Sequence, residues 1–163
     1  MISILLASTL VFGDMDKTGS GKEFCEALNN YKGTTVVMNS NGGIVQEAAI
    51  ATQCIQGKDV IVKVLKSQSA ATYMLHGIPW KCYHPKAVIT AHNVSDGKRE
   101  DLNESREFFL ALNQVYIEWG VDPSKFMATN YAAIMTPFNS YVEISVKEAI
   151  YYFGGVVCSV KGG

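Results

Sequence analysis

The sequence predicts an α/β fold with a largely parallel sheet, and two observations lead to it. Short apolar or β-branched runs alternate along the chain with segments in which apolar residues recur at helical spacing. Turns that carry glycine or serine separate the two kinds of segment, as in a chain that passes repeatedly from strand to helix. At 163 residues with 48% hydrophobic content, the chain can bury a substantial core, so we expect a single domain over residues 1–163.

The first part of the chain shows this alternation clearly. An apolar run that ends at Gly13 predicts a first buried strand, and apolar residues at helical spacing predict a helix over 22–31. A β-branched run over 34–38 predicts a second strand, and a helical pattern resumes after the Asn-Ser-Asn-Gly-Gly turn at 39–43. Two consecutive glycines allow the backbone to approach a ligand and to point N–H groups outward. The turn is therefore either an ordinary tight turn or part of a binding site.

The same unit repeats between residues 59 and 92. The run DVIVKVL predicts a strand, residues 69–77 predict a short helix, and KAVITA predicts the next strand, which ends just before His92. In a parallel sheet the loops past the carboxyl ends of the strands gather on one side, where ligands bind. The sequence therefore predicts that the Gly42-Gly43 turn, Ser69 and His92 lie close together.

Helices dominate the second half of the chain. A broad apolar stripe predicts one long helix over 102–119, which is a core element or an interface. A second helix over 122–135 starts at an Asp-Pro pair that suits a helix N-terminus. Ser145 and Glu148 predict a capping box for a further helix, and the apolar run VVCSV closes the chain.

The composition excludes several classes of protein. A formal charge of -1 with scattered basic residues gives no electrostatic reason to expect a nucleic acid or an anionic membrane as partner. No apolar run approaches the length of a membrane span, and the apolar opening lacks the basic region of a signal peptide. We therefore expect a cytoplasmic protein.

Neither a metal nor a nucleotide site is predicted. The four cysteines lie far apart with no CxxC pair, so we expect four reduced or buried thiols, no metal and no cofactor. The fragment TGSGK is not a phosphate loop, because Asp16 stands where that motif needs glycine and Glu23 where it needs serine or threonine.

Ser69 and His92 are the candidates for nucleophile and base. A serine becomes nucleophilic when a neighbouring base takes its proton and N–H donors receive the oxyanion. His92 follows a predicted strand, whereas His76 and His84 fall in a helix and in a loop before proline. Ser67 competes with Ser69, but small alanines follow Ser69 and leave room for a substrate carbonyl. The alternative roles are a helix N-cap for the serine and a structural histidine.

Three segments together carry a resemblance to a known family. The turn N-S-N-G-G-I-V is similar to the N-S-P-G-G-x-V turn of ClpP-type serine peptidases. S-A-A-T-Y-M-L-H-G resembles their serine-bearing helix, and H-P-K-A-V-I-T-A-H resembles the strand that delivers their histidine. I-S-V-K-E-A-I-Y-Y-F-G-G-V-V resembles the family's L-S-x-x-E-A-x-x-Y-G-L-V segment. The resemblance covers nearly the whole chain, and the Ser-Ala-Ala form is closest to the phage and predicted periplasmic ClpP-like branches.

The resemblance implies a ClpP/crotonase-type fold and a catalytic site. By position, Ser69 is the nucleophile, His92 is the general base, and the N–H groups of Gly43 and Ala70 form the oxyanion hole. Asn41 stands where the family has proline, a change that would loosen the oxyanion turn.

The third member of the triad departs from the family, because its acid has no aspartate counterpart in P-F-N-S-Y-V-E-I-S. Asn139 is the first candidate to hold the histidine, since an amide oxygen can accept from the ring N–H. Tyr141 occupies the ungapped position, and Glu143 is the nearest carboxylate.

The resemblance implies a serine endopeptidase that acts on peptides or unfolded proteins through an acyl-enzyme, with activity impaired if the triad is incomplete. The alternatives are a catalytically inactive structural or binding subunit and a crotonase-type hydrolase acting on acyl-CoA. The helix over 102–119 matches the family's handle region, so we expect a homo-oligomer. Because the chain begins almost at its first strand, we do not expect an AAA+ unfoldase as partner.

Overall fold

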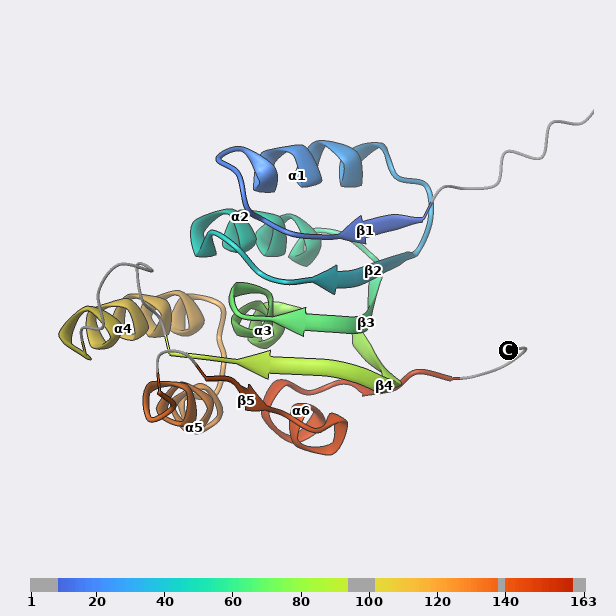
Figure 1. The fold of residues 1–163 in the computed structure, drawn as a ribbon. Coiled ribbons are helices and arrows are strands. Elements are labelled where there is room, and N and C mark those ends of the chain that lie inside the picture. Colours follow the sequence, from blue (N-terminus) through green and yellow to red (C-terminus); the bar gives the residue numbers. More distant parts are fainter. Residues whose placement is uncertain (1–8, 94–101, 138–139, 160–163) are drawn as a thin grey trace, which may run out of the picture.

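A computed structural model of the chain describes residues 9–93, 102–137 and 140–159. Within them, six strands form one mixed sheet in the order β1-β2-β3-β4-β5, with β6 also paired to β4 (Figure 1). All pairs are parallel except β4 with β5. The strands are β1 (Leu10–Phe12), β2 (Thr35–Ser40), β3 (Ile61–Gln68), β4 (Lys81–Ala91), β5 (Val142–Glu143) and β6 (Val156–Val157). The predicted α/β class with a largely parallel sheet is confirmed.

The helices also follow the sequence pattern closely. They are α1 (Ser20–Asn30), α2 (Val45–Gln56), α3 (Ala70–Met74), the 3-10 turn η1 (Leu75–Gly77), α4 (Leu102–Glu118), α5 (Pro123–Ile134) and α6 (Val146–Phe153). Asp122 caps α5 by accepting from the Ser124 N–H, and Ser145 with Glu148 forms the predicted capping box of α6.

The strand β4 is longer than the sequence predicts. The apolar run KAVITA predicts that it begins at Lys86. The strand instead starts at Lys81, and its register with β3 shifts between the Val64–Tyr83 and Lys66–Val88 pairs. Pro85 lies within this irregular stretch of the pairing, where it does not have to donate a ladder hydrogen bond.

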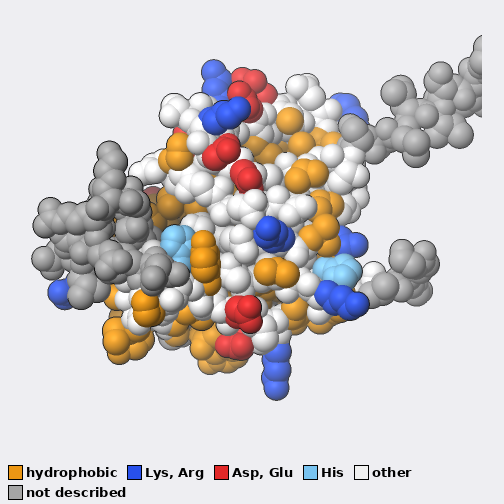
Figure 2. Space-filling view, viewed as in Figure 1, with side chains coloured by type: hydrophobic (Ala, Val, Ile, Leu, Met, Phe, Trp, Pro, Cys, Tyr) orange, Lys and Arg blue, Asp and Glu red, His pale blue; other side chains and the backbone are white. Residues whose placement is uncertain are grey.

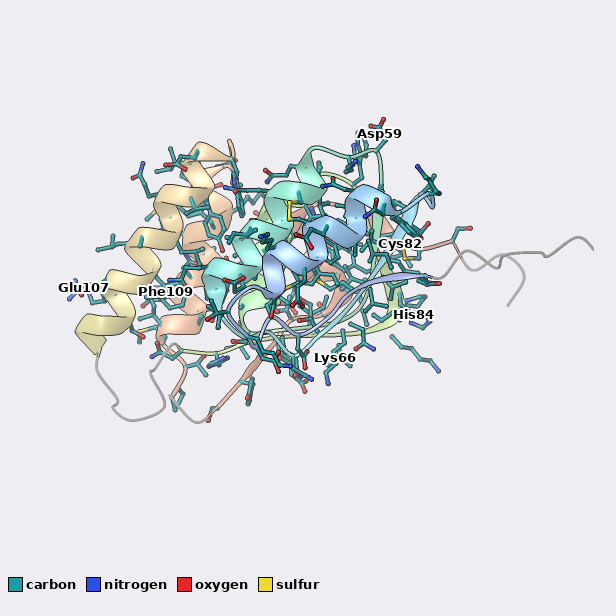
Figure 3. All side chains as sticks on the ribbon, turned by 90° about the horizontal axis from the view of Figure 1, so that it is seen from above. Asp59, Lys66, Cys82, His84, Glu107 and Phe109 are labelled. Atoms are coloured by element: carbon teal, nitrogen blue, oxygen red, sulfur yellow. A yellow bond between two sulfur atoms is a disulfide. The ribbon has the colours of Figure 1, made fainter. Side chains whose placement is uncertain are left out.

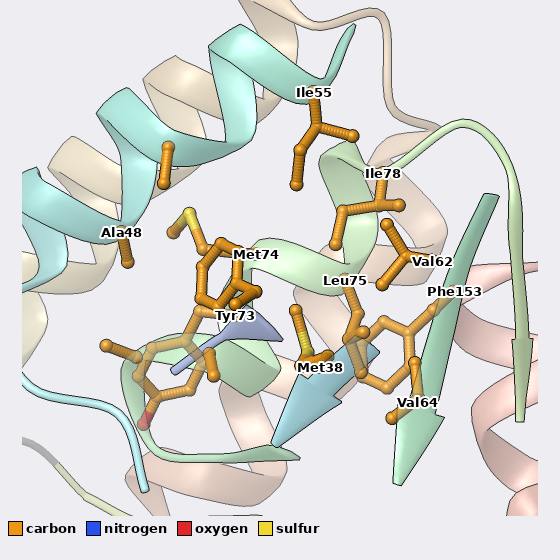
Figure 4. Packing of buried hydrophobic residues seen from close by; sticks show 14 of the residues in the cluster. Met38, Ala48, Ile55, Val62, Val64, Tyr73, Met74, Leu75, Ile78 and Phe153 are labelled. Atoms are coloured by element: carbon orange, nitrogen blue, oxygen red, sulfur yellow. The ribbon is translucent and has the colours of Figure 1, made fainter. Parts of the chain in front are cut away.

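Helices α1 and α2 cover one face of the sheet, whereas Lys66 points to the opposite face (Figure 3). On the covered face, alternate strand residues face the helices, as the two-residue period of a strand requires. Met38, Val62 and Val64 are fully buried there and pack toward Ile55 of α2 and Met74 of α3 (Figure 4). Burial of each such side chain stabilises the fold by about 1.5–3 kcal/mol, so this layer holds the strand ends in place.

Two disulfides correct the expectation of four reduced or buried thiols. Cys25 of α1 bonds to Cys54 of α2, and Cys82 of β4 bonds to Cys158 just after β6. The sequence did not reveal them because the partners are 29 and 76 residues apart and follow no spacing motif. Disulfides are typical of oxidising surroundings, so they suggest a non-reducing compartment, and the expected cytoplasmic location is not confirmed.

Among the helices of the described ranges, none combines the length and the apolar character needed to cross a bilayer.

Candidate active site

Ser69 lies in the sharp turn between β3 and α3. It is the only residue other than glycine with a positive φ in the described part of the chain, at φ 52° and ψ -123°. Such a backbone costs about 1–3 kcal/mol and persists only where the surroundings enforce it. Its N–H donates to the Thr90 carbonyl of β4 at 3.2 Å, and its side chain makes no capping bond to α3. A strained strand-to-helix turn that presents a serine is typical of a nucleophile.

The hydroxyl of Ser69 is directed at His92. The two residues follow the neighbouring parallel strands β3 and β4, and Oγ of Ser69 lies 2.7 Å from Nε2 of His92. The predicted contact between nucleophile and base is therefore present in the structure, at the distance of a short O–H···N hydrogen bond.

Asn93 determines which way this hydrogen bond runs. Nδ1 of His92 lies 2.7 Å from the Asn93 carbonyl oxygen, which can only accept. Nδ1 must therefore carry the proton, and in the neutral ring Nε2 is then free to accept from the Ser69 hydroxyl. The ring is held in the tautomer that a general base requires.

The sequence did not point to Asn93, whose backbone oxygen carries no sequence signal. Its side chain is buried, with 1% of its surface exposed. Nδ2 donates to the Ile134 carbonyl at 3.0 Å, and Oδ1 accepts from the Ser105 hydroxyl. These bonds tie the segment after β4 to α4 and α5.

The three residues considered for the third triad position fare differently. Asn139 lies outside the described residues. The ring of Tyr141 is 5.3 Å from the His92 ring, centroid to centroid, at an angle of 57°. Glu143 is exposed and is the cross-strand partner of Thr90, which precedes His92 by two residues. Within the described residues, the ring nitrogen that faces away from Ser69 is bonded to Asn93.

Tyr73 of α3 holds the backbone of His92 by a hydrogen bond. Its hydroxyl donates to the His92 carbonyl oxygen, and the Tyr116 hydroxyl of α4 donates to the Tyr73 carbonyl at 2.8 Å. Burial raises the pKa of Tyr73 well above its usual value, so the phenol remains a donor at any physiological pH. The long helix is thus connected to the base through two tyrosines.

The Gly42-Gly43 turn packs directly against Ser69. A Cβ on Gly42, where φ is +97°, would lie 2.8 Å from Cβ of Ser69 and 2.9 Å from N of Ala70. Gly43 is exposed with φ +126°, and a Cβ there would collide with the backbone of Met15. Only glycine permits this approach, as the turn between strand and helix predicts.

The two predicted oxyanion donors are both free for a ligand. In the described ranges, neither the Gly43 N–H nor the Ala70 N–H has a hydrogen-bond acceptor. Ala70 is fully buried beside the nucleophile, where an unmatched donor is costly unless a ligand oxygen fills the position. Ala70 directly follows Ser69, and Gly43 follows Gly42, which packs against Ser69; an oxyanion hole requires donors beside the nucleophile.

Asp14 holds the glycine turn through Asn41. Its Oδ1 accepts from the backbone N–H of Asn41 at 2.6 Å, and its Oδ2 accepts from the Asn41 side chain at 3.3 Å. Met15 adds two backbone hydrogen bonds. Its N–H donates to the Gly42 carbonyl, and its carbonyl accepts from the Ile44 N–H. The turn at Asn41 is therefore held by hydrogen bonds with Asp14 and Met15.

The remaining serine and histidine candidates have structural partners. Ser67 is buried, with Oγ 3.2 Å from Oγ1 of Thr72. Nε2 of His76 lies 2.9 Å from Oγ1 of Thr129, and Nδ1 of His84 accepts from a backbone N–H in its own turn. None of the three competes with Ser69 and His92.

No family model matches the chain, and no curated protein matches it. In the described ranges, no group of three or more histidine, cysteine or acidic side chains is placed to hold a metal ion.

Proposed function

We propose that the chain is a ClpP-like serine endopeptidase with a ClpP/crotonase-type fold. The observation that carries the proposal is the 2.7 Å contact between Oγ of Ser69, on a strained turn, and Nε2 of His92 in its acceptor tautomer. The resemblance to the family rests on a glycine turn, a serine-bearing helix and a histidine-bearing strand in this order along the chain. Support comes from the sheet, in which the strands β2, β3 and β4 that lead to these three positions are neighbours.

The geometry supports acyl transfer to the serine. Oγ of Ser69 attacks the carbonyl carbon of the scissile amide while its proton passes to Nε2 of His92. The carbonyl oxygen becomes an oxyanion that the N–H groups of Gly43 and Ala70 receive. The imidazolium returns the proton to the leaving amine. Water then attacks the acyl-serine with His92 as base, which releases the acid and restores the serine.

A catalytically weak or inactive subunit is the second candidate, and one observation favours it. The partner of Nδ1 among the described residues is a neutral carbonyl, not a carboxylate. A carbonyl fixes the tautomer, but it stabilises the imidazolium less than a negative charge does. We therefore expect a slow enzyme.

We also propose that the chain self-associates through α4 and α5. Leu110 of α4 and Met127, Tyr131 and Met135 at α5 expose 60% or more of their surface, and a pocket lies between the two helices. Exposed apolar residues on adjacent helix faces are typical of an interface. Sedimentation velocity over a range of concentrations tests this, and a monomer at every concentration would refute it.

The peptidase is tested by hydrolysis of an unfolded protein substrate, with products identified by mass spectrometry. Wild-type protein should release peptides, and Ser69→Ala and His92→Ala should lower kcat by about a thousandfold or more. Equal rates for wild type and Ser69→Ala would exclude Ser69 as nucleophile. No cleavage by folded wild-type protein would favour the inactive subunit.

A further inference from the structure

The glycines of the fragment TGSGK bind a carboxylate of the chain itself. The fragment, residues 18–22, leads into α1, and Gly19 has a positive φ of +95°. The N–H groups of Gly19 and Gly21 both donate to Oε1 of Glu47, at 3.1 and 3.0 Å. Glu47 belongs to the first turn of α2. The N–H groups at the start of a helix favour an anion, and here a side chain supplies it. The catalytic steps proposed above use none of these groups.

Gly21 allows α1 to lie directly against α2 at this point. A Cβ on Gly21 would collide with the backbone carbonyl oxygen of Glu47, so only glycine permits the close approach. The two helices lie side by side (Figure 3), and the disulfide between Cys25 and Cys54 joins them further along. The start of α1 is therefore fixed to the start of α2.

The same two chain segments also meet at the glycine turn. The N–H of Met15 donates to the Gly42 carbonyl at 2.8 Å, and the Met15 carbonyl accepts from the Ile44 N–H at 2.7 Å. Met15 also forms a parallel β-bridge with Gly43. The loop before α1 and the turn before α2 are therefore joined at two places, by Met15 and by Glu47. Gly43, the predicted oxyanion donor, lies between these two contacts.

The carboxylate of Glu47 acts through these N–H groups and not through an ion pair. Lysine and acidic side chains lie around the loop between β1 and α1 on the face that Figure 2 shows. Among the described residues, however, Glu47 forms no ion pair. A charged acceptor strengthens the hydrogen bonds that it receives. Removal of the carboxylate should therefore act first on the start of α1 and on the loop that precedes it.

We propose that Glu47 is a positioning residue that, through α1 and Met15, holds the Gly43 N–H beside Ser69. Without the carboxylate, the loop that carries Met15 loses its attachment to α2, so the glycine turn moves more freely and the oxyanion loses a fixed donor. The effect on rate rests on the proposed peptidase function, whereas the attachment of the turn is measured without catalysis.

The first test follows hydrogen exchange of the Met15 and Ile44 amides by NMR. Glu47→Ala removes the acceptor, and both amides should exchange about tenfold faster than in wild type. Glu47→Gln keeps an oxygen that can accept the same N–H groups, so its rates should stay near those of wild type. The amides of β3 and β4 should stay slow in both variants, which shows that the chain is folded. Equal rates in wild type and Glu47→Ala would overturn the proposal.

Asp122→Ala is the matched control. Asp122 is also a carboxylate that accepts two hydrogen bonds at the start of a helix, from N–H and Oγ of Ser124. It caps α5 and makes no contact with the glycine turn. Exchange of the Met15 and Ile44 amides should stay unchanged in this variant. Equal acceleration in Asp122→Ala and Glu47→Ala would show a general loosening of the fold and would overturn the specific role of Glu47.

The second test measures steady-state kinetics on a peptide substrate. In Glu47→Ala, kcat should fall about tenfold and KM should change by less than about twofold, because the oxyanion forms only in the transition state. Glu47→Gln should recover most of the rate. Faster exchange at Met15 and Ile44 with an unchanged kcat would refute the positioning role. If wild-type protein cleaves no substrate, the proposed function fails, and the exchange rates alone decide whether Glu47 holds the turn.

Discussion

His92 is oriented by the backbone of its neighbour Asn93, whose carbonyl oxygen lies 2.7 Å from Nδ1 of the ring. This contact fixes the tautomer in which Nε2 faces the Ser69 hydroxyl. It brings no negative charge, and charge is what a carboxylate adds in a serine triad. In the described part of the chain, the candidate site is therefore a Ser69–His92 pair with a neutral carbonyl as the partner of Nδ1.

The side chain of Asn93 should control the activity through this support. Asn93→Ala removes the bonds to the Ile134 carbonyl and the Ser105 hydroxyl, so the carbonyl that holds His92 loses its anchor. We expect kcat to fall about tenfold with little change in KM, because the loss acts on the base and not on substrate contacts. Steady-state kinetics of a peptide substrate measure both constants.

The matched control is Asn113→Ala. It removes the amide pair between Asn113 and Asn130, which joins α4 to α5 without touching the His92 ring. Its kcat should stay near that of wild type. An unchanged kcat in folded Asn93→Ala would contradict the positioning role of that residue.

Gly42→Ala should abolish the activity of a protein that still folds. The added Cβ would lie 2.8 Å from Cβ of Ser69, so Ser69 or the glycine turn must move. Gly120→Ala is the matched control, because its φ is also positive, at +74°, but no atom lies within 4 Å of the new Cβ. Backbone strain should cost each variant about 1–2 kcal/mol of stability, and Gly42→Ala should lose more because its Cβ also collides with Ser69 and Ala70. Only Gly42→Ala should lose activity, and equal activity of the two would show that the turn is not part of the site.

His76 should make the protein sensitive to acid. Burial, and secondly the charge of Lys81, lowers the pKa of His76 to about 3 from its ordinary 6.5. The unfolded chain takes up this proton between pH 6.5 and 3 while the folded chain does not, so stability is lost as the pH falls through that window. The free energy of unfolding should fall by about 1.4 kcal/mol per pH unit from this group alone.

Urea titrations at several pH values measure this slope. His76→Gln should flatten the slope, because the variant has no imidazole that must stay neutral between Tyr116 and Phe153. His84→Gln, which replaces a histidine in the turn before Lys86 and outside this aromatic site, serves as the control. The same slope in wild type and His76→Gln would contradict the assignment.

The disulfide between Cys82 and Cys158 should be a major contributor to stability. It closes a loop of 76 residues and holds β6 against β4. In the chain-entropy account, the double variant Cys82→Ser/Cys158→Ser should lose about 4 kcal/mol of unfolding free energy in urea. The pair Cys25→Ser/Cys54→Ser, which opens a shorter loop of 29, should lose somewhat less. Four titratable thiols in the unfolded, unreduced protein would contradict both bonds.

Much of the frame of the site could be predicted from local patterns. The repeated strand and helix periods predict that Ser69 and His92 follow adjacent parallel strands, and parallel strands bring their carboxyl ends together. The double glycine predicts a close approach, which the space around Gly42 explains. These features depend on residue type and order, which a single sequence contains.

The remaining features depend on contacts that have no sequence pattern. The partner of His92 is a backbone oxygen, which every residue has. Asp14 meets Asn41 across 27 residues, and the disulfide partners lie as far apart or further. The assignment of Asn139 stays a prediction, because that residue lies outside the described ranges. Such pairings arise from the tertiary fold, so only coordinates reveal them.

The most direct measurement of the central claim is covalent labelling of Ser69 by a fluorophosphonate. The reagent forms a bond with a serine only when a base accepts its proton and donors receive the oxyanion. We predict one adduct per chain, located on Ser69 by peptide mass spectrometry and absent in Ser69→Ala. Labelling should fall strongly in His92→Ala. Folded wild-type protein that remains unlabelled at high reagent concentration would contradict the assignment of Ser69 and His92 as nucleophile and base.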